Sequence, residues 1–245
     1  MLVIFPFEVP LYEQAGVPVE FVGHPLVELL APAQPRERWL DSCGLDPAKP
    51  VVALLPGSRP NEIHRLLPVL LESIPLIRRT VPTAQFVIAR APALPDDLFA
   101  PAIGTAGLTV VTGITDQVLE AADVVVTASG TATVQTALHD RSMIIVYRVS
   151  TLDAAIARAA VRLSTFGMVN LVAGRTIVPE LIQEACTPER VAHETVSLLT
   201  DTARVLAMHR DLAAVREALG GTGASERAAA AVARVVARAQ AGVKY

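Results

Sequence analysis

The 245-residue sequence predicts an α/β fold with a doubly wound parallel sheet, followed by helices at the C-terminal end. Three short and largely apolar runs, Val51–Leu55, Asp123–Thr127 and Ser142–Val146, have the length and hydrophobicity of strands that are buried on both faces. Segments with a helical spacing of apolar residues separate these runs. Repeated strand–helix units of this length place successive strands parallel, with ligands bound at the carboxyl ends of the strands.

The first 31 residues form a group of their own. Two strands are predicted, Leu2–Phe5 and Val17–Val22, with a helix over Glu8–Gly16 between them. Two strands and one helix cannot bury both faces of a sheet. We therefore expect residues 1–31 to be the trailing edge of an N-terminal Rossmann-like domain whose earlier part is absent. The proline-rich segment Ala31–Pro35 is typical of a linker.

Residues 32–185 carry the predicted sheet. A helix is expected over Arg36–Cys43, and Glu62–Thr80 has apolar residues at helical spacing. Pro68 and Pro75 favour a kink or a break in the second of these helices. The other expected elements are strands over Gln85–Ala89 and Leu108–Thr112 and helices over Pro95–Gly107, Asp116–Ala122 and Thr131–His139.

After Tyr147 the strand patterns stop, and only helices are expected. They cover Leu152–Leu163, Pro179–Glu184, Pro188–Leu199, Thr202–Leu219 and Ser225–Ala241. We assign residues 186–245 to a C-terminal helical tail.

The composition argues against several classes of function. A net charge of -3 and an aromatic content of 4% disfavour a nucleic-acid partner. Cys43 and Cys186 lie far apart and form no redox or metal motif, and H-E-x-x-H is absent, so we expect no metal and no other cofactor. No signal peptide is visible, and no apolar stretch reaches the roughly 18 residues of a spanning helix. A reducing cytoplasm is the expected compartment.

Two strand–glycine–helix turns contain the candidate binding residues. The first comprises Gly57, Ser58, Arg59 and Glu62, and the second comprises Ser129, Gly130, Thr131 and Gln135. We expect free backbone amides at each turn, which favour an anion together with the helix dipole, and Arg59 can add a forked contact to phosphate. The alternative is that these side chains only cap helices. Because two such turns in one sheet can face the same crevice, the pair indicates a diphosphate, and thus a nucleotide. Neither turn matches a Walker or a dinucleotide motif.

Longer motifs run along nearly the whole chain. In order they are Phe21–Pro25, Leu54–Arg59 with Asn61–Ile63, Ala128–Thr133, Tyr147–Arg148, Asn170–Arg175 and Val178–Gln183. In kind and order they resemble the motifs of the bacterial lipid-A-disaccharide synthase family. The run N-L-x-A-G-R with a downstream P-E-L-x-Q is the most specific of them.

The resemblance implies a GT-B type glycosyltransferase, with an active site between two Rossmann-like domains. That family transfers 2,3-diacylglucosamine from its UDP derivative to 2,3-diacylglucosamine 1-phosphate, without a metal, and forms the disaccharide of lipid A and UDP. Residues 32–185 would be the UDP-sugar-binding domain. The acidic catalytic residue would lie in the N-terminal domain that we expect to be missing, so the chain is expected to be a truncated form.

The resemblance also implies roles for single residues. The diphosphate would lie near Ser129, Gly130 and Thr131, the uracil against Gly113 and Ile114, and Gly57, Ser58 and Arg59 would face the reacting phosphates. There Arg59 would stabilise the charge that grows on departing UDP. Gln135 stands where relatives usually have a glutamate that holds the ribose hydroxyls, so it keeps an acceptor but loses the charge.

Three further expectations concern the end of the sheet domain. Asn170 and Arg175 either line the cleft or fix the loop before the C-terminal helices, and Val169 stands where relatives commonly have proline. The segment Leu152–Phe166, with Arg158 and Arg162, either rests on an anionic membrane or packs on the core.

Histidines are expected to be structural. We place His24 at the hinge between the domains, and expect His64, His139, His193 and His209 to be surface or packing residues.

Partners and location follow from the resemblance. The partners would be the UDP-activated sugar and the lipid acceptor, in the cytoplasm or at the inner face of the bacterial inner membrane, and a homo-oligomer is compatible with the sequence. Two other functions stay open, namely a UDP-N-acetylglucosamine 2-epimerase-like enzyme and a non-catalytic nucleotide-binding module.

Overall fold

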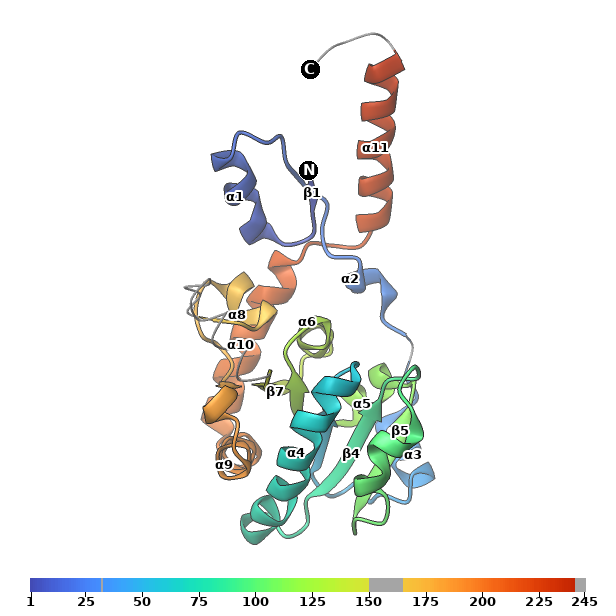
Figure 1. Ribbon diagram of the computed structural model, residues 1–245, viewed down its shortest axis with the longest axis vertical. Coiled ribbons are helices and arrows are strands. Elements are labelled where there is room, and N and C mark those ends of the chain that lie inside the picture. The colour runs from blue at the N-terminus through green and yellow to red at the C-terminus, as the bar shows by residue number, and fades with distance from the viewer. Residues whose placement is uncertain (32, 150–164, 241–245) are drawn as a thin grey trace.

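A six-stranded parallel sheet forms the centre of the computed structural model, which describes residues 1–31, 33–149 and 165–240 (Figure 1). The strands lie in the order β5 (Leu108–Thr112), β4 (Gln85–Arg90), β3 (Val51–Leu55), β6 (Val124–Ala128), β7 (Ser142–Tyr147) and β8 (Glu180–Ile182). The chain starts in the middle at β3, builds outward through β4 and β5, and then returns to build the other half. This is the doubly wound arrangement that the strand patterns predicted.

The neighbouring strands β3 and β6 run side by side in close register. Ala53 pairs with Val125 and Leu55 with Thr127, so both strands end at the same edge of the sheet. Every residue of both strands is buried, which explains their continuous apolar runs. The point where the strand order reverses lies between them, and ligands of open α/β sheets bind at such a point.

Two groups of helices cover the sheet. The first group contains α4 (Pro60–Thr80), η2 (Asp96–Ala102) and α9 (Pro188–Thr200), and the second contains α3 (Arg36–Ser42), α5 (Thr115–Ala121), α6 (Thr131–Leu138), α8 (Met168–Ala173) and α10 (Thr202–Ala218). Contacts link α4 with α9, and α6 with α8 and α10. Right-handed crossovers place the two groups on opposite faces.

The two prolines inside α4 do not break it. The helix runs without interruption from Pro60 to Thr80, although a break was one of the two expectations. Pro68 and Pro75 both lie on its exposed face, so the backbone carbonyls that lose a partner can be solvated. The buried face of the helix keeps its apolar contacts, and these hold the helix together.

Strands do not stop after Tyr147, which is the main error of the sequence prediction. Glu180–Ile182 forms β8 beside β7, and η3 (Gln183–Ala185) follows it, where a helix over Pro179–Glu184 was expected. Three residues are too few to show a period of two. The expected helix over Pro95–Gly107 is the shorter 3-10 helix η2, and the expected helix over Leu152–Leu163 lies outside the described residues.

The N-terminal segment lies beyond the sheet and contacts the last helix. It comprises β1 (Leu2–Val3), η1 (Pro6–Glu8), α1 (Val9–Gln14), β2 (Glu20–Phe21) and α2 (Leu26–Leu29), and α11 (Ala224–Gln240) stands beside it in Figure 1. Arg227 donates to the carbonyl of Val22 at 2.8 Å, and Arg234 pairs with Glu20 at 2.7 Å. The C-terminal helix therefore returns to the start of the chain. The division into residues 1–31, 32–185 and 186–245 stays a prediction.

His24 is structural, as expected. Its side chain is buried, its Nδ1 accepts from the amide of Leu26 at 3.2 Å, and its backbone amide donates to the carbonyl of Leu219 at 2.9 Å. Burial lowers the pKa of this imidazole, which favours the neutral form that such an accepting nitrogen requires. No helix in the described ranges is long and apolar enough to cross a bilayer.

The carboxylate of Glu28 attaches α2 to the start of α11 and gives a pH-dependent contact. It accepts from the amide of Gly223 at 2.6 Å and from the hydroxyl of Ser225 at 2.7 Å. The Ser225 hydroxyl, followed by the amides of Gly223 and Ser225, holds the pKa of Glu28 below its usual value of 4.5. The contact therefore stabilises the fold fully above about pH 4.5, and this stabilisation is lost as the pH falls through the lower folded-state pKa.

We predict that Glu28→Gln is less stable than wild type at pH 7, and that the difference shrinks as the pH is lowered below 4.5. Urea unfolding across this range measures it. The matched control is Glu37→Gln, an exposed carboxylate on α3, which should show no such change. A stability difference for Glu28→Gln that is constant with pH would contradict the prediction.

Candidate functional site

Both predicted turns line one cavity of about 310 Å³ at the carboxyl ends of β3 and β6. The first turn contributes Leu55, Gly57, Ser58, Arg59 and Glu62, the second contributes Ala128, Ser129, Gly130, Thr131, Ala132 and Gln135, and Ala89, Ala91 and Thr115 complete the wall. The in-register pairing of β3 with β6 brings the two turns together. Their shared crevice was the central expectation from the sequence.

A larger hollow of about 540 Å³ lies at the opposite, amino-terminal edge of the sheet. Its lining includes Arg36, Lys49, Asp123 and Arg141. The guanidinium of Arg36 is already used, because it donates to the carbonyls of Ala121 and Pro47 and to Asp123. The smaller cavity is the better candidate, because it combines helix N-termini with the edge of the sheet where ligands bind.

The first turn is occupied by a side chain of its own. The carboxylate of Glu62 accepts from the amide of Ser58 at 2.8 Å and from that of Arg59 at 3.2 Å. Gly57 has φ +120°, and a Cβ there would clash with Oε2 of Glu62. The expectation of free amides at this turn is therefore wrong, because a glutamate in the first turn of α4 caps them.

The second turn is open by comparison. Gly130, with φ +149°, precedes α6, and in the described part of the chain no side chain caps this helix N-terminus. Ser129 donates from its hydroxyl to the carbonyl of Phe166 at 3.2 Å, away from the first amides of α6. The dipole and the unsatisfied amides of the first turn of α6 can therefore act on an anion near Thr131.

Arg59 supplies the positive charge at the cavity. Of the described lining residues it is the basic one, and its side chain is 78% exposed. Its Nη1 lies 2.8 Å from Oε1 of Glu62. An exposed ion pair of this kind is weak, so an incoming phosphate can replace the carboxylate as the partner of Arg59.

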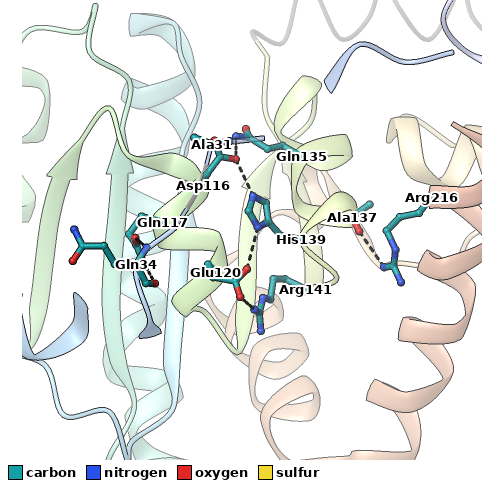
Figure 2. A network of polar contacts seen from close by, with 10 residues as sticks. All are labelled: Ala31, Gln34, Asp116, Gln117, Glu120, Gln135, Ala137, His139, Arg141 and Arg216. Carbon is teal, nitrogen blue, oxygen red and sulfur yellow. Dashed lines mark hydrogen bonds and ion pairs between the residues drawn. The ribbon is translucent and has the colours of Figure 1, made fainter. Parts of the chain in front are cut away.

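Gln135, which lines the cavity, belongs to a network of polar contacts (Figure 2). Its Nε2 donates to Oδ1 of Asp116 at 2.6 Å, and Nε2 of His139 lies 2.8 Å from the same oxygen. Nδ1 of His139 faces Glu120 at 3.3 Å, and Glu120 pairs with Arg141 at 3.1 Å. Among the described residues no group of three His, Cys, Asp or Glu side chains is arranged to hold a metal ion.

Sequence reasoning missed this network. His139 was expected at the surface or in packing. Its side chain is only 7% exposed, which fits packing, but its contacts with two carboxylates were not expected. A signal was available in the sequence. Asp116 and Glu120, and likewise Gln135 and His139, are four residues apart, a spacing that places each pair on one side of its helix. Burial favours a higher pKa for Asp116, but hydrogen bonds from His139 and Gln135 outweigh it and hold the pKa below the usual value.

Gly113 and Ile114 lie just outside the cavity lining, next to Thr115, which is part of it. Gly113 has φ +74°, and its amide donates to the carbonyl of Arg90 at 3.1 Å. Ile114 is 42% exposed at the start of α5. This short turn after β5 is therefore at the rim, with an apolar side chain available to a flat ligand group.

Asn170 and Arg175 are not among the residues that line the cavity. Asn170 is fully buried, and its Oδ1 accepts from the amides of Ile177 and Val178 at 2.8 and 3.0 Å. Its Nδ2 donates to the carbonyl of Val178 and to Glu180. These bonds use its whole capacity and support the loop-fixing alternative. Arg175 is 60% exposed and pairs with Asp211 on α10.

Comparison with known proteins gives a consistent assignment. Residues 1–235 match the protein family described as Lipid-A-disaccharide synthetase. The lipid-A-disaccharide synthases of Geobacter metallireducens and Geobacter sulfurreducens are 45% and 44% identical over 234 residues, which are 95% of this chain and 61% of each relative. The chain thus spans about 61% of the length of these curated relatives.

Solved structures share the fold at low sequence identity. A Listeria monocytogenes protein, provisionally assigned as a UDP-N-acetylglucosamine 2-epimerase, gives a TM-score of 0.60 at 12% identity, over 88% of this chain and 56% of its own. Anabaena HepE in complex with UDP-glucose gives 0.57 at 12% identity, over 95% and 63%. The calicheamicin glycosyltransferase CalG4 gives 0.56 at 18% identity, over 96% and 54%. These likenesses confirm a GT-B fold.

The two alternatives for the loop before the C-terminal helices can be separated by stability. We predict that Asn170→Ala lowers the free energy of unfolding by roughly 2–4 kcal/mol, because it leaves several buried polar groups without partners. Arg175→Ala, the control on the same loop, should cost about 0.5 kcal/mol or less, as expected for an exposed ion pair. Urea denaturation measures both. A near-neutral Asn170→Ala would show that the loop does not depend on this side chain.

Proposed function

The chain belongs to the lipid-A-disaccharide synthase family, and we propose that it supplies the UDP-sugar site for the transfer of 2,3-diacylglucosamine to 2,3-diacylglucosamine 1-phosphate. The products are the lipid A disaccharide and UDP. One observation carries this proposal: the open N-terminus of α6 and the exposed Arg59 face one cavity at the edge of the sheet where nucleotides bind.

The cavity offers two independent means of holding a diphosphate. The amides and dipole at Gly130 and Thr131 bind one phosphate, where the small side chains allow close approach. Arg59, on the facing turn, takes the other phosphate in place of Glu62. As the bond between the sugar and UDP breaks, negative charge grows on the departing diphosphate, and both groups stabilise it.

We place the other binding regions around this cavity. Ile114 and Gly113 at the rim contact the uracil, and Gln135 contacts the ribose. The acceptor sugar and the acidic catalytic residue belong to the part of the family's proteins that this chain does not span.

The substrates imply a place in the cell. Because both carry acyl chains, we place the reaction at the inner face of the bacterial inner membrane, with peripheral contact. The segment Leu152–Phe166, for which membrane contact and packing on the core were both open, lies largely outside the described residues. Self-association of the chain remains part of this proposal.

A second candidate is a nucleotide-binding module without turnover. Two observations favour it. The chain spans 61% of the length of its relatives, and the described residues contain one six-stranded sheet of the kind that binds nucleotides. Glycosyl transfer on a GT-B fold uses two domains, so this chain could bind a nucleotide without catalysing the transfer.

We predict that the chain binds UDP and that Arg59→Ala weakens this binding by about 10- to 100-fold, because a charge-assisted hydrogen bond to phosphate is lost. Isothermal titration calorimetry with UDP measures the affinity. The control is Arg79→Ala, an exposed arginine at the far end of α4, which should bind UDP like wild type. Equal affinity of Arg59→Ala and wild type would contradict the role of Arg59.

We also predict that the 245-residue chain alone forms no disaccharide from the two lipid substrates, although it binds UDP. The full-length lipid-A-disaccharide synthase of Geobacter metallireducens, assayed in parallel, is the positive control. Disaccharide formation by this chain at a comparable rate would refute the proposed division of labour. A free epimerised sugar as the product would instead support an epimerase.

A further inference from the structure

We propose that Asp116 is a positioning residue for Gln135. By accepting a hydrogen bond from the amide nitrogen of Gln135, it leaves the amide oxygen to accept one from a ligand hydroxyl in the cavity. The inference rests on the proposed nucleotide site and specifies it further. It assigns to that site the ability to distinguish a ribonucleotide from its 2′-deoxy analogue.

The position of Gln135 on α6 is the first step. It lines the cavity about one helical turn after Thr131, where the first amides of the helix lie. One turn of an α-helix rises about 5.4 Å. Gln135 is therefore near enough to a phosphate at the helix N-terminus to reach a hydroxyl of a sugar beside that phosphate.

The second step is the orientation of the amide group. A glutamine amide has a donating NH₂ end and an accepting oxygen end, whereas an ionised carboxylate only accepts. Nε2 of Gln135 lies 2.6 Å from Oδ1 of Asp116, so the donating end is committed to that carboxylate. A flipped amide would place two oxygens against each other. Within the described part of the chain, Oε1 of Gln135 accepts no hydrogen bond, so it is the end left for a ligand.

The third step is that Asp116 is itself fixed. Oδ1 also faces Nε2 of His139 at 2.8 Å, and Oδ2 accepts from the backbone amide of Ala31 at 3.2 Å. Figure 2 shows Asp116 between Gln135 and His139, with Glu120 on the far side of the imidazole. Asp116 therefore has little freedom to turn away from Gln135, because its side chain is held from two other directions.

Selectivity follows from this arrangement. A site that accepts a hydrogen bond from a ligand hydroxyl loses that bond when the hydroxyl is absent, and its acceptor stays unpaired. Gln135 is neutral, so it recognises a hydroxyl without adding a second negative charge beside Asp116. The chemical class that fits is a nucleoside diphosphate with a free 2′-hydroxyl next to the 3′-hydroxyl.

The test compares UDP with 2′-deoxy-UDP by calorimetry. Wild type should bind UDP about 3- to 10-fold more tightly than 2′-deoxy-UDP, because the loss of one hydrogen bond weakens binding by about this factor. Asp116→Ala should remove this preference while it changes the affinity for 2′-deoxy-UDP by less than about twofold. Gln135→Leu should do the same, and the double variant should show no further loss, because both changes remove one interaction.

A conservative variant and a control complete the design. Asp116→Asn should restore part of the preference, since its carbonyl can still accept from Gln135 in one of its two orientations. Asp211→Ala, which removes a carboxylate from the ion pair with Arg175, should keep the wild-type preference. If Asp116→Ala fails to fold, Asp116→Asn still tests Asp116, because its preference should fall below that of wild type, and Gln135→Leu tests the acceptor.

The outcomes separate the two proposals. No UDP binding by wild type would overturn the proposed site and this inference with it. UDP binding with an unchanged preference in Asp116→Ala, or in Asp116→Asn if Asp116→Ala does not fold, would overturn the role of Asp116. An unchanged preference in Gln135→Leu would overturn the acceptor role of Gln135 and the role of Asp116 with it.

Discussion

The parallel pairing of β3 with β6 is the constraint on which the rest of the structure depends. Leu55 and Thr127 are partners in this pairing, so the two glycine turns that follow them leave the sheet at the same level. A shift of one residue would move every side chain of these strands to the opposite face. The cavity thus exists because two strands that are distant in sequence are neighbours where the strand order reverses.

The two turns contribute different features to the cavity. Glu62 occupies the amides of the first turn and keeps Arg59 beside the cavity, whereas the second turn leaves the start of α6 open. The first side therefore contributes an exposed charge and the second the N-terminus of a helix. Behind the second side, Asp116 accepts a hydrogen bond from Gln135 and also contacts His139. The cavity thus combines one exposed cation with an uncapped helix N-terminus and a hydrogen-bonded amide.

The sheet could be predicted from the sequence because its central strands are buried on both faces and are therefore continuously apolar. β8 could not be predicted, because three residues are too few to show the alternation of a strand. Its position depends on tertiary contacts, namely its pairing with β7 and the hydrogen bonds that Glu180 accepts from the amides of Phe166 and Gly167. The glycine turns were visible as motifs. The capping by Glu62 and the contacts of His139 were not, because only tertiary structure shows which helix face lies against another.

The return of α11 to the N-terminal segment has a mechanical consequence. The backbone passes between that segment and the sheet twice, once near Ala31 and once at Leu219–Gly223, and the contacts of Glu28 and Arg227 lie beside the second passage. Two passages restrict the relative movement of the segment and the sheet more than a single passage would. Any change in the relative position of the segment and the sheet would thus have to bend the backbone at both passages.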